Sequence, residues 1–185
     1  MQKKIFPIIL IAALLVSSLV SLFFIHNLQG NAKVINYAGV VRGATQRLIK
    51  QELNHLPNDA LIGQIEGILE ELQTGQGEHG LTRLDSDEFQ GLIVRMRDEW
   101  EQMKEEIYLV RAGGDTDALF EASEAFFGLA DQTVATAEMF SEKSVRSAQR
   151  SMFILNCAFV LLMVLLYIYS ANQVKRQREL EKAEE

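Results

Sequence analysis

The chain has 185 residues, 48% of them hydrophobic, and its 18 Lys and Arg against 25 Asp and Glu give a formal net charge of −7. This length suffices for one ordinary domain, and the acidic balance excludes the basic face of a nucleic-acid-binding protein. The single cysteine excludes an internal disulfide framework and any zinc site built from several cysteines. Two prolines and few alternating segments disfavour an all-β fold. We therefore expect an all-α protein.

The hydrophobic residues are concentrated in two uncharged runs near the ends of the chain. The first, residues 5–25, is about as long as a helix that crosses a bilayer. A cleaved signal peptide has a shorter apolar core followed by a small-residue cleavage site, which residues 26–29 do not offer, so an anchor is favoured. The second, residues 152–170, includes Tyr167 and Tyr169, which are typical of a membrane interface.

Basic residues flank both runs and set the expected orientation. Lys3 and Lys4 precede the first run, and three bases lie within residues 175–178, so both termini are predicted to be cytoplasmic. The bases within residues 143–150 argue the other way, but long translocated segments largely escape this rule. Five segments result: a cytoplasmic N-terminus (1–4), a first transmembrane helix (5–25), an extracytoplasmic segment (26–151), a second transmembrane helix (152–170) and a cytoplasmic helical linker (171–185).

The first two helices of the extracytoplasmic segment are bounded by proline and glycine. The first continues from the membrane to about Leu56, where Pro57 stops it. Asn58 can cap a second helix over residues 60–73. The apolar residues of that helix share one stripe: Leu61, Ile65, Ile68, Leu69 and Leu72. The glycine-rich residues 75–80 end it.

Two further helices complete the predicted fold. The third begins near Ser86, where Asp85 and Glu88 have the spacing of a capping box. Its apolar residues recur at steps of three and four: Phe89, Leu92, Ile93, Met96, Trp100, Met103, Ile107 and either Leu109 or Val110. The fourth follows residues 113–116 and continues through the second run to Glu185. Its apolar positions before the membrane are Leu119, Phe120, Phe126, Phe127, Leu129, Val134, Met139 and Phe140. Short connections predict an up-down-up-down four-helix bundle.

Side chains able to perform catalysis show no recognisable arrangement. The histidines, His26, His55 and His79, have no histidine or cysteine partner at metal-ligand spacing. No glycine-rich loop follows a strand, as a phosphate site requires. We therefore expect no enzyme activity, no metal and no cofactor within these residues.

The predicted first helix carries an unusual distribution of charge. Residues 27–150 hold 12 Lys and Arg and 21 Asp and Glu, yet residues 33–50 contain no acid and four bases: Lys33, Arg42, Arg47 and Lys50. At about 1.5 Å per residue, Arg42 lies roughly 25 Å and Arg47 roughly 33 Å beyond Ile25, which is too far for lipid headgroups. Either these arginines pair with acids on neighbouring helices, or they offer their planar guanidinium groups to an anion.

Two glycines lie beside these arginines. Gly39 and Gly43 are four residues apart and therefore share a helix face, where they would let a second helix approach closely. That helix is either a neighbour in the same bundle or the first helix of a second copy. In the second case two Arg42 side chains converge on one ligand at the two-fold axis.

The segment VINYAGVVRGATQRL, residues 34–48, resembles the first-helix motif of bacterial nitrate/nitrite-sensing histidine kinases and of the N-terminal domain of type IV pilus methyl-accepting chemotaxis proteins. The shared pattern is I-N-x-A-G-x-x-R, four residues, then R. The resemblance implies a dimeric periplasmic four-helix bundle in which Arg42 binds the anion between the two first helices. Gly39 would give the close approach, with Asn36 and Arg47 in support. Gly43 departs from the pattern, where a bulky apolar residue is usual, as do Val40 and Val41, where several relatives are polar.

The leading hypothesis is the ligand-sensing region of a bacterial inner-membrane receptor: the front end of a histidine kinase, a diguanylate cyclase or a chemoreceptor. Its expected partners are a small nitrate-like or carboxylate anion, membrane lipids and a second copy in a homodimer. Too few residues follow the second run for a linker domain of the HAMP type, so we expect the protein to continue beyond Glu185. The alternative is a two-span adaptor or structural protein that senses no ligand.

Overall fold

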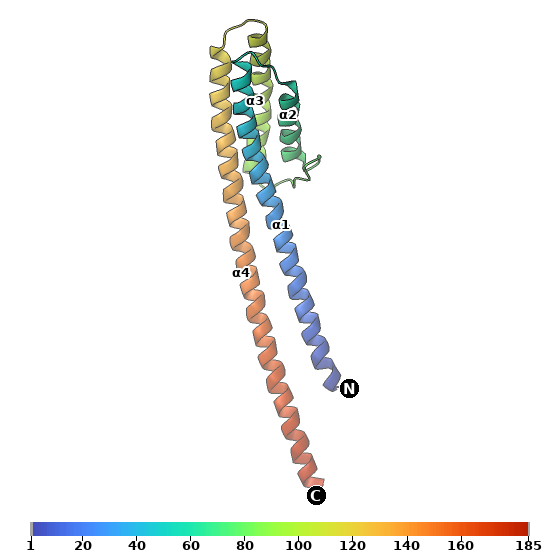
Figure 1. Ribbon diagram of the computed structural model, residues 1–185. Helices are drawn as coiled ribbons and strands as arrows, with labels where there is room; N and C mark the ends of the chain where they lie inside the picture. Colours follow the sequence, from blue (N-terminus) through green and yellow to red (C-terminus); the bar gives the residue numbers. More distant parts are fainter. Residues whose placement is uncertain (1, 185) are drawn as a thin grey trace. The chain divides into compact units, whose positions relative to one another are not determined.

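The computed structural model describes residues 2–184, with side chains from residue 8 onward except at 177, 181, 183 and 184. The elements are helices α1 (Gln2–Glu52), α2 (Asp59–Thr74), α3 (Asp87–Arg111) and α4 (Asp117–Glu184) (Figure 1). No strand occurs within residues 2–184. The prediction of an all-α chain with four helices is therefore confirmed.

The chain divides into two compact units. One holds Asn27–Ser144, and the other holds the chain up to His26 and from Val145 onward. Helices α1 and α4 each contain an 18-residue apolar window that is long enough to cross a membrane, and no part of the chain that the structure describes buries either window. Exposed side chains such as Phe23 and Phe153 belong to these apolar surfaces. By length and composition, two helices of the chain are able to span a membrane.

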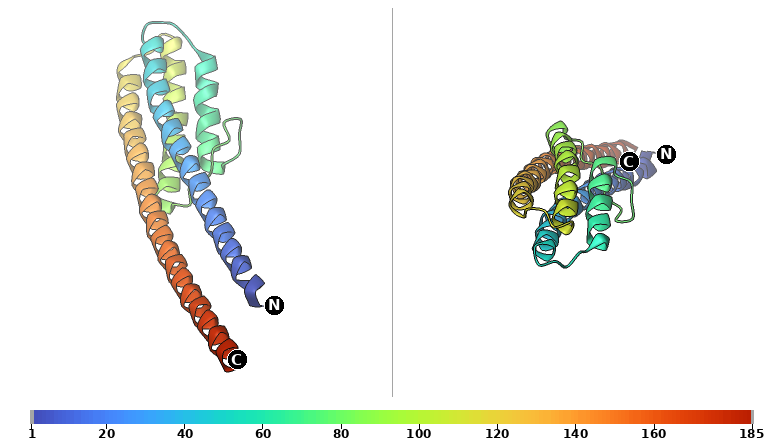
Figure 2. Two further views of the ribbon diagram at one scale, coloured as in Figure 1. Left: turned by 60° about the horizontal axis from the view of Figure 1, so that its bottom comes forward. Right: turned by 90° about the horizontal axis from the view of Figure 1, so that it is seen from above.

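In the unit Asn27–Ser144, segments of all four helices lie together (Figure 2). Their side chains contribute to one apolar core. The stripes predicted for α2 and α3 are buried, and Val110 rather than the exposed Leu109 takes the last position in α3. Helix α4 departs from its predicted stripe, because Phe120 and Met139 are exposed. Leu119, Phe126 and Leu129 of the predicted stripe are buried. Small residues fill further core positions of α4: Ala130, Thr133 and Ala137. Their small side chains let α4 pack closely against the core.

Local capping positions α2 and α3. The Asn58 side chain accepts a hydrogen bond from the backbone N–H of Leu61 at 3.0 Å, which confirms the predicted cap of α2. At α3 the prediction of Asp85 as the cap was wrong. Ser86 has the extended backbone of an N-cap and accepts from the N–H of Phe89 at 3.3 Å, which leaves Glu88 one position short of a capping box.

The end of α1 also differs from its prediction. The helix stops at Glu52 rather than near Leu56, because the chain already turns through residues 53–55. His55 takes a left-handed backbone conformation, with φ of 58°. Pro57 therefore follows a turn rather than ending the helix itself.

Arg111 joins the ends of three helices at this turn. Its Nε and Nη2 donate to the two carboxylate oxygens of Glu52, at 2.8 and 2.7 Å, and Nη1 donates to Asp59 at 2.7 Å. These hydrogen bonds, those to Glu52 foremost, raise the pKa of Arg111 against the opposing effect of burial. Glu52 is only 2% exposed, so the Arg111–Glu52 pair joins α3 to α1 inside the molecule, and the Arg111–Asp59 pair joins α3 to α2 at the surface.

A buried carboxylate holds the loop between α2 and α3. The side chain of Glu71 is 1% exposed and accepts from the backbone N–H of Leu81 at 2.8 Å and of His79 at 3.0 Å. Its Oε2 also lies 2.8 Å from His79 Nδ1. From α1, Lys33 donates to the carbonyl of His79, and the Tyr37 ring lies 4.7 Å from the His79 ring. The loop is thus tied to both α1 and α2.

Changing Glu71 to glutamine should release this loop. Burial by itself would raise the pKa of Glu71, but the hydrogen bonds from Leu81 and His79 outweigh it and hold the pKa below 4.5. The carboxylate therefore stabilises the loop fully above pH 4.5 and loses this effect as the pH falls through the lowered pKa. Glutamine supplies one acceptor oxygen instead of two, so exchange of the Leu81 amide hydrogen should accelerate about tenfold or more at neutral pH.

The measurement is hydrogen exchange at the Leu81 amide as a function of pH, after correction for the intrinsic exchange rate. Glu70→Gln, the same change at an exposed neighbour on α2, is the control and should leave protection unchanged. Equal protection of Leu81 in wild type and Glu71→Gln would refute the role given to Glu71.

Candidate ligand-binding site

The predicted site residues lie on α1 in the unit Asn27–Ser144. The core side of α1 is marked by Val34, Val41 and Leu48, which are fully buried at steps of seven residues. Asn36, Gly43 and Arg47 are all exposed, and their spacings of seven and four place them on one stripe. The helical period puts this stripe opposite the core. Gly39 is half-buried at its edge.

The two glycines face open space. A Cβ atom added at Gly39 or at Gly43 would meet no described atom within 4 Å apart from the adjoining residues and backbone of its own helix. Within the described part of this chain, therefore, no neighbouring helix uses the close approach that they allow. Of the two alternatives raised by the sequence, a close neighbour within the same bundle is therefore not observed among the described residues.

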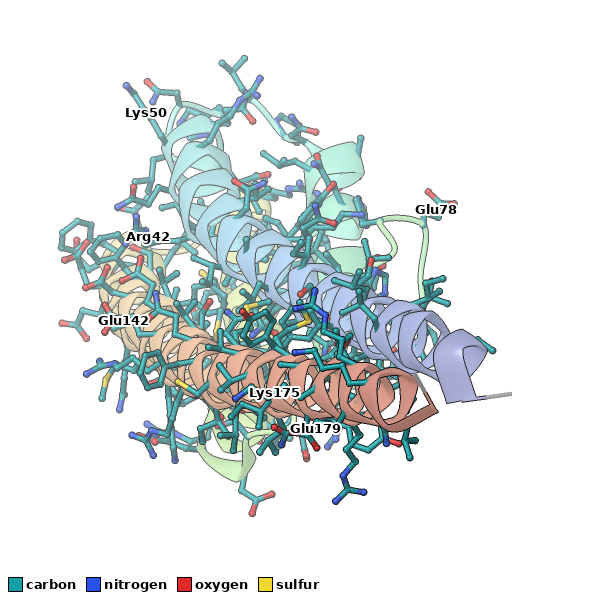
Figure 3. The ribbon with its side chains drawn as sticks, turned by 90° about the horizontal axis from the view of Figure 1, so that it is seen from below. Arg42, Lys50, Glu78, Glu142, Lys175 and Glu179 are labelled. Atoms are coloured by element: carbon teal, nitrogen blue, oxygen red, sulfur yellow. The ribbon has the colours of Figure 1, made fainter. Side chains whose placement is uncertain are left out.

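Arg42 lies on the side of α1 that faces α4. Its Nη1 donates to Asp131 Oδ1, a carboxylate of α4, and the two side chains are 36% and 61% exposed. Figure 3 labels the Arg42 side chain on α1. For Arg42, pairing with an acid on a neighbouring helix is thus observed. Arginine has five N–H donors, so most of its hydrogen-bonding capacity is left for another partner.

The remaining bases of the acid-free stretch differ in their surroundings. Lys33 is engaged with the α2–α3 loop. Arg47 and Lys50 are exposed and make no ion pair with any described residue. The positive charge available to a ligand on this part of α1 therefore comes from Arg47 and Lys50 and from Arg42, which is paired with Asp131.

This surface can donate hydrogen bonds to a planar oxyanion. A guanidinium group matches nitrate and carboxylate geometry through its parallel N–H groups, and the glycines leave room above the helix. The surface lacks enclosure in the single chain, because Arg47 is exposed and Arg42 is partly exposed, and water weakens the attraction of each for an anion. Among the described residues, no group of three or more His, Cys, Asp or Glu side chains is arranged to hold a metal ion.

Asp131 was not identified from the sequence as a neighbour of Arg42. The two residues are 89 positions apart, and their meeting depends on the register of α4 against α1. The regular spacing of apolar residues gives the core face of each helix but not this register. The sequence alone therefore does not indicate which acidic residue of α4 faces Arg42.

The chain was compared with known proteins. No protein-family model matches it, and no curated protein matches it by sequence. Among solved structures, the ligand-binding domain of the nitrate receptor McpN of P. aeruginosa is similar, with a TM-score of 0.52 and 20% sequence identity. The match covers 58% of this chain and 94% of that domain. At this identity the comparison establishes a likeness of fold: this chain contains the fold of a receptor's ligand-binding domain.

Proposed function

We propose that this chain is the ligand-sensing region of a bacterial transmembrane signal-transduction receptor, which binds a small anion as a homodimer. The observation that carries the proposal is the open stripe of α1, where two unfilled glycine positions lie beside Arg42 and Arg47. The fold likeness to a nitrate receptor's ligand-binding domain and the resemblance of residues 34–48 to nitrate-sensor motifs support it. Nitrate or a small carboxylate is the ligand class that fits these arginines.

Dimerisation supplies the enclosure that the single chain lacks. If two copies of α1 meet across Gly39 and Gly43, the two Arg42 side chains lie near one two-fold axis. Water is then excluded from both guanidinium groups, and their attraction for a shared anion rises as the local dielectric constant falls. Asn36 and Arg47, on the same stripe, border the interface and add donors to it. The four-helix segment would form the up-down-up-down bundle of such a sensor.

Signal transmission requires an element that connects the site to the cytoplasm. Helix α4 runs without interruption from Asp117 to Glu184, and its residue Asp131 contacts Arg42. With spans at residues 5–25 and 152–170, residues 26–151 lie in the periplasm. An anion that binds one arrangement of the dimer more tightly than another shifts α4 by a small sliding or rotation. A kinase, cyclase or chemotaxis module beyond the second span reads that shift.

The test uses the full chain in lipid nanodiscs, with its melting temperature measured in nitrate and in chloride at equal ionic strength. Ligand stabilisation grows with the logarithm of concentration over Kd, so millimolar nitrate should raise the melting temperature of the wild type. Arg42→Ala should abolish this rise but leave the ligand-free value nearly unchanged, because exposed ion pairs contribute under about 1 kcal/mol. Arg95→Ala, at an exposed arginine of α3, is the control. Undiminished stabilisation of Arg42→Ala by nitrate would refute the site.

Removing the charge of Asp131 should strengthen anion binding. The Asp131 carboxylate competes with an incoming anion for Arg42 and repels that anion. Asp131→Asn is therefore expected to lower the Kd for nitrate up to about fivefold, the range of an exposed ion pair. Titration calorimetry measures this, with Asp98→Asn, an exposed aspartate of α3, as the control. Weaker binding by Asp131→Asn would mean that Asp131 positions Arg42 rather than competing for it.

A further inference from the structure

A stripe of acidic side chains runs along α4. Residues 112–142 contain seven Asp and Glu and no Lys or Arg. Four of these acids recur at steps of seven residues and are all exposed: Asp117, Glu124, Asp131 and Glu138. Steps of seven keep residues on one side of a helix, and Asp131 contacts Arg42 of α1. This acidic stripe therefore lies along the edge of α4 that adjoins α1.

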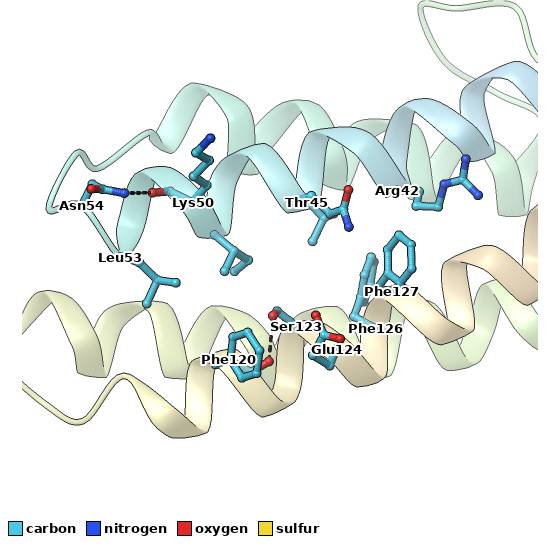
Figure 4. A pocket seen from close by; sticks show the side chains of 12 residues that line it. Arg42, Thr45, Lys50, Leu53, Asn54, Phe120, Ser123, Glu124, Phe126 and Phe127 are labelled. Atoms are coloured by element: carbon cyan, nitrogen blue, oxygen red, sulfur yellow. Dashed lines mark hydrogen bonds between the residues drawn. The ribbon is translucent and has the colours of Figure 1, made fainter.

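The charge of the acidic stripe is not balanced within the chain. Asp131 is the only member that forms an ion pair with a residue that the structure describes. Glu124 and Lys50 both line a cavity between α1 and α4, but the Lys50 amine points away from α4 (Figure 4). Along this edge, one paired base thus stands against four acids, and the remaining negative charge is available to a partner.

The open stripe of α1, beside this edge of α4, is basic. Lys50 follows Gly43 by seven residues and therefore extends the stripe that holds Gly43 and Arg47. Arg47 and Lys50 are exposed and form no ion pair with a described residue, and they belong to a stretch without acids. Helices α1 and α4 together thus present one surface with a basic half and an acidic half.

This surface is complementary to a second copy of itself. A two-fold rotation about an axis along the helices places α1 of each copy against α4 of the other, so opposite charges meet twice. A surface of a single sign would instead repel its own copy.

The levels of the charges along the two helices also agree. Residues after Arg42 in α1 lie beside residues before Asp131 in α4. At about 1.5 Å per residue, Lys50 lies roughly 12 Å from the level of the Arg42–Asp131 pair, and Glu124 lies roughly 11 Å from it in the same direction. An axis along the helices keeps every residue at its level, so Lys50 of one copy lies at the level of Glu124 of the other.

We propose that the second copy docks on this surface, with Arg47 and Lys50 of each chain against Glu124 of the other chain and against Glu121, which is exposed one turn before it. This docking rests on the proposed homodimer and adds the partner's α4 to the surface that α1 meets. The unfilled glycine positions of the open stripe allow the partner to approach closely. The exposed charges then select the partner and its orientation more than they add affinity.

The test measures energy transfer between donor-labelled and acceptor-labelled full chains in a zwitterionic detergent. One variant reverses the bases of α1, Arg47→Glu with Lys50→Glu, and another reverses the acids of α4, Glu121→Lys with Glu124→Lys. Each variant should raise the dissociation constant of its homodimer about tenfold or more, because like charges now meet at both symmetry-related contacts. Mixed with each other, the two variants should form a heterodimer tighter than either homodimer, because every contact again joins opposite charges.

The matched control is Asp98→Lys with Glu105→Lys, at two exposed acids of α3. It changes the net charge as much as the α4 variant does and should dimerise as wild type does. Undiminished dimerisation of the α4 variant, or a mixture that forms no heterodimer, would overturn this docking but leave a dimer through α1 alone intact. A wild type that stays monomeric would instead refute the proposed homodimer itself.

Discussion

Replacing Arg111 by methionine is expected to lower the free energy of unfolding by about 3–5 kcal/mol, the range for breaking a buried ion pair from one side. Methionine keeps much of the apolar stem but leaves the Glu52 carboxylate, 2% exposed, without its bidentate partner. Asp59 loses its partner too, but it is 79% exposed, and water compensates for that loss. The damage therefore comes almost entirely from Glu52.

Chemical denaturation of the full chain measures this effect. Trp100 is the single tryptophan and is 1% exposed, so its fluorescence reports the loss of the core. Arg95→Met, the same change at an exposed arginine of α3, should alter stability by less than about 0.5 kcal/mol. A double variant, Arg111→Met with Glu52→Met, should recover part of the loss, because it leaves no buried charge. A loss below about 1 kcal/mol for Arg111→Met would contradict this explanation.

Substituting leucine for both Gly39 and Gly43 is expected to abolish dimerisation and the response to anion while stabilising the single chain. Glycine inside a helix costs about 0.8–1 kcal/mol relative to good helix formers, and a Cβ at either position meets no described atom within 4 Å. The isolated chain should therefore gain up to about 1 kcal/mol per site. The proposed dimer loses its close approach because two bulky side chains now separate the copies of α1.

Gly91→Leu is the matched control. Gly91 is also exposed in a helix interior, on α3, with no atom within 4 Å of an added Cβ. It should gain the same helix stability but keep the dimer and the response. Sedimentation in detergent, together with nitrate-dependent melting, distinguishes the two variants. A Gly39→Leu, Gly43→Leu chain that still dimerises and responds would show that the dimer forms through another surface.

The helices were predictable because their signals are local. Asn58 caps α2 as expected, and the buried stripe of α3 recurs at the expected steps. The error at Asp85 is of one residue, since Ser86 beside it competes for the same role. The exposed Phe120 shows the limit of the pattern, because size and hydrophobicity alone do not reveal that Ala130 and Ala137 lie in the core while this phenylalanine does not.

The side-chain contacts that join different elements, the Arg42–Asp131 pair of the candidate site among them, could not be predicted from the sequence. The Glu71 carboxylate is satisfied by backbone groups of a loop that has no periodicity to interpret. Arg111 meets Glu52 across 59 residues of sequence, and Arg42 meets Asp131 across 89. Such pairs depend on helix register and rotamer. The sequence predicts that the two glycines leave space for a second helix. It does not predict whether that helix belongs to the same chain, and in the structure no helix of the described chain fills this space.

The central proposal is that one anion binds between two copies of Arg42, and the number of anions bound per chain tests it most directly. Titration calorimetry of the full chain in nanodiscs with nitrate should give one ion per two chains, and Arg42→Ala should give no binding. One nitrate per chain, or binding that survives in Arg42→Ala, would contradict a shared site at the Arg42 pair.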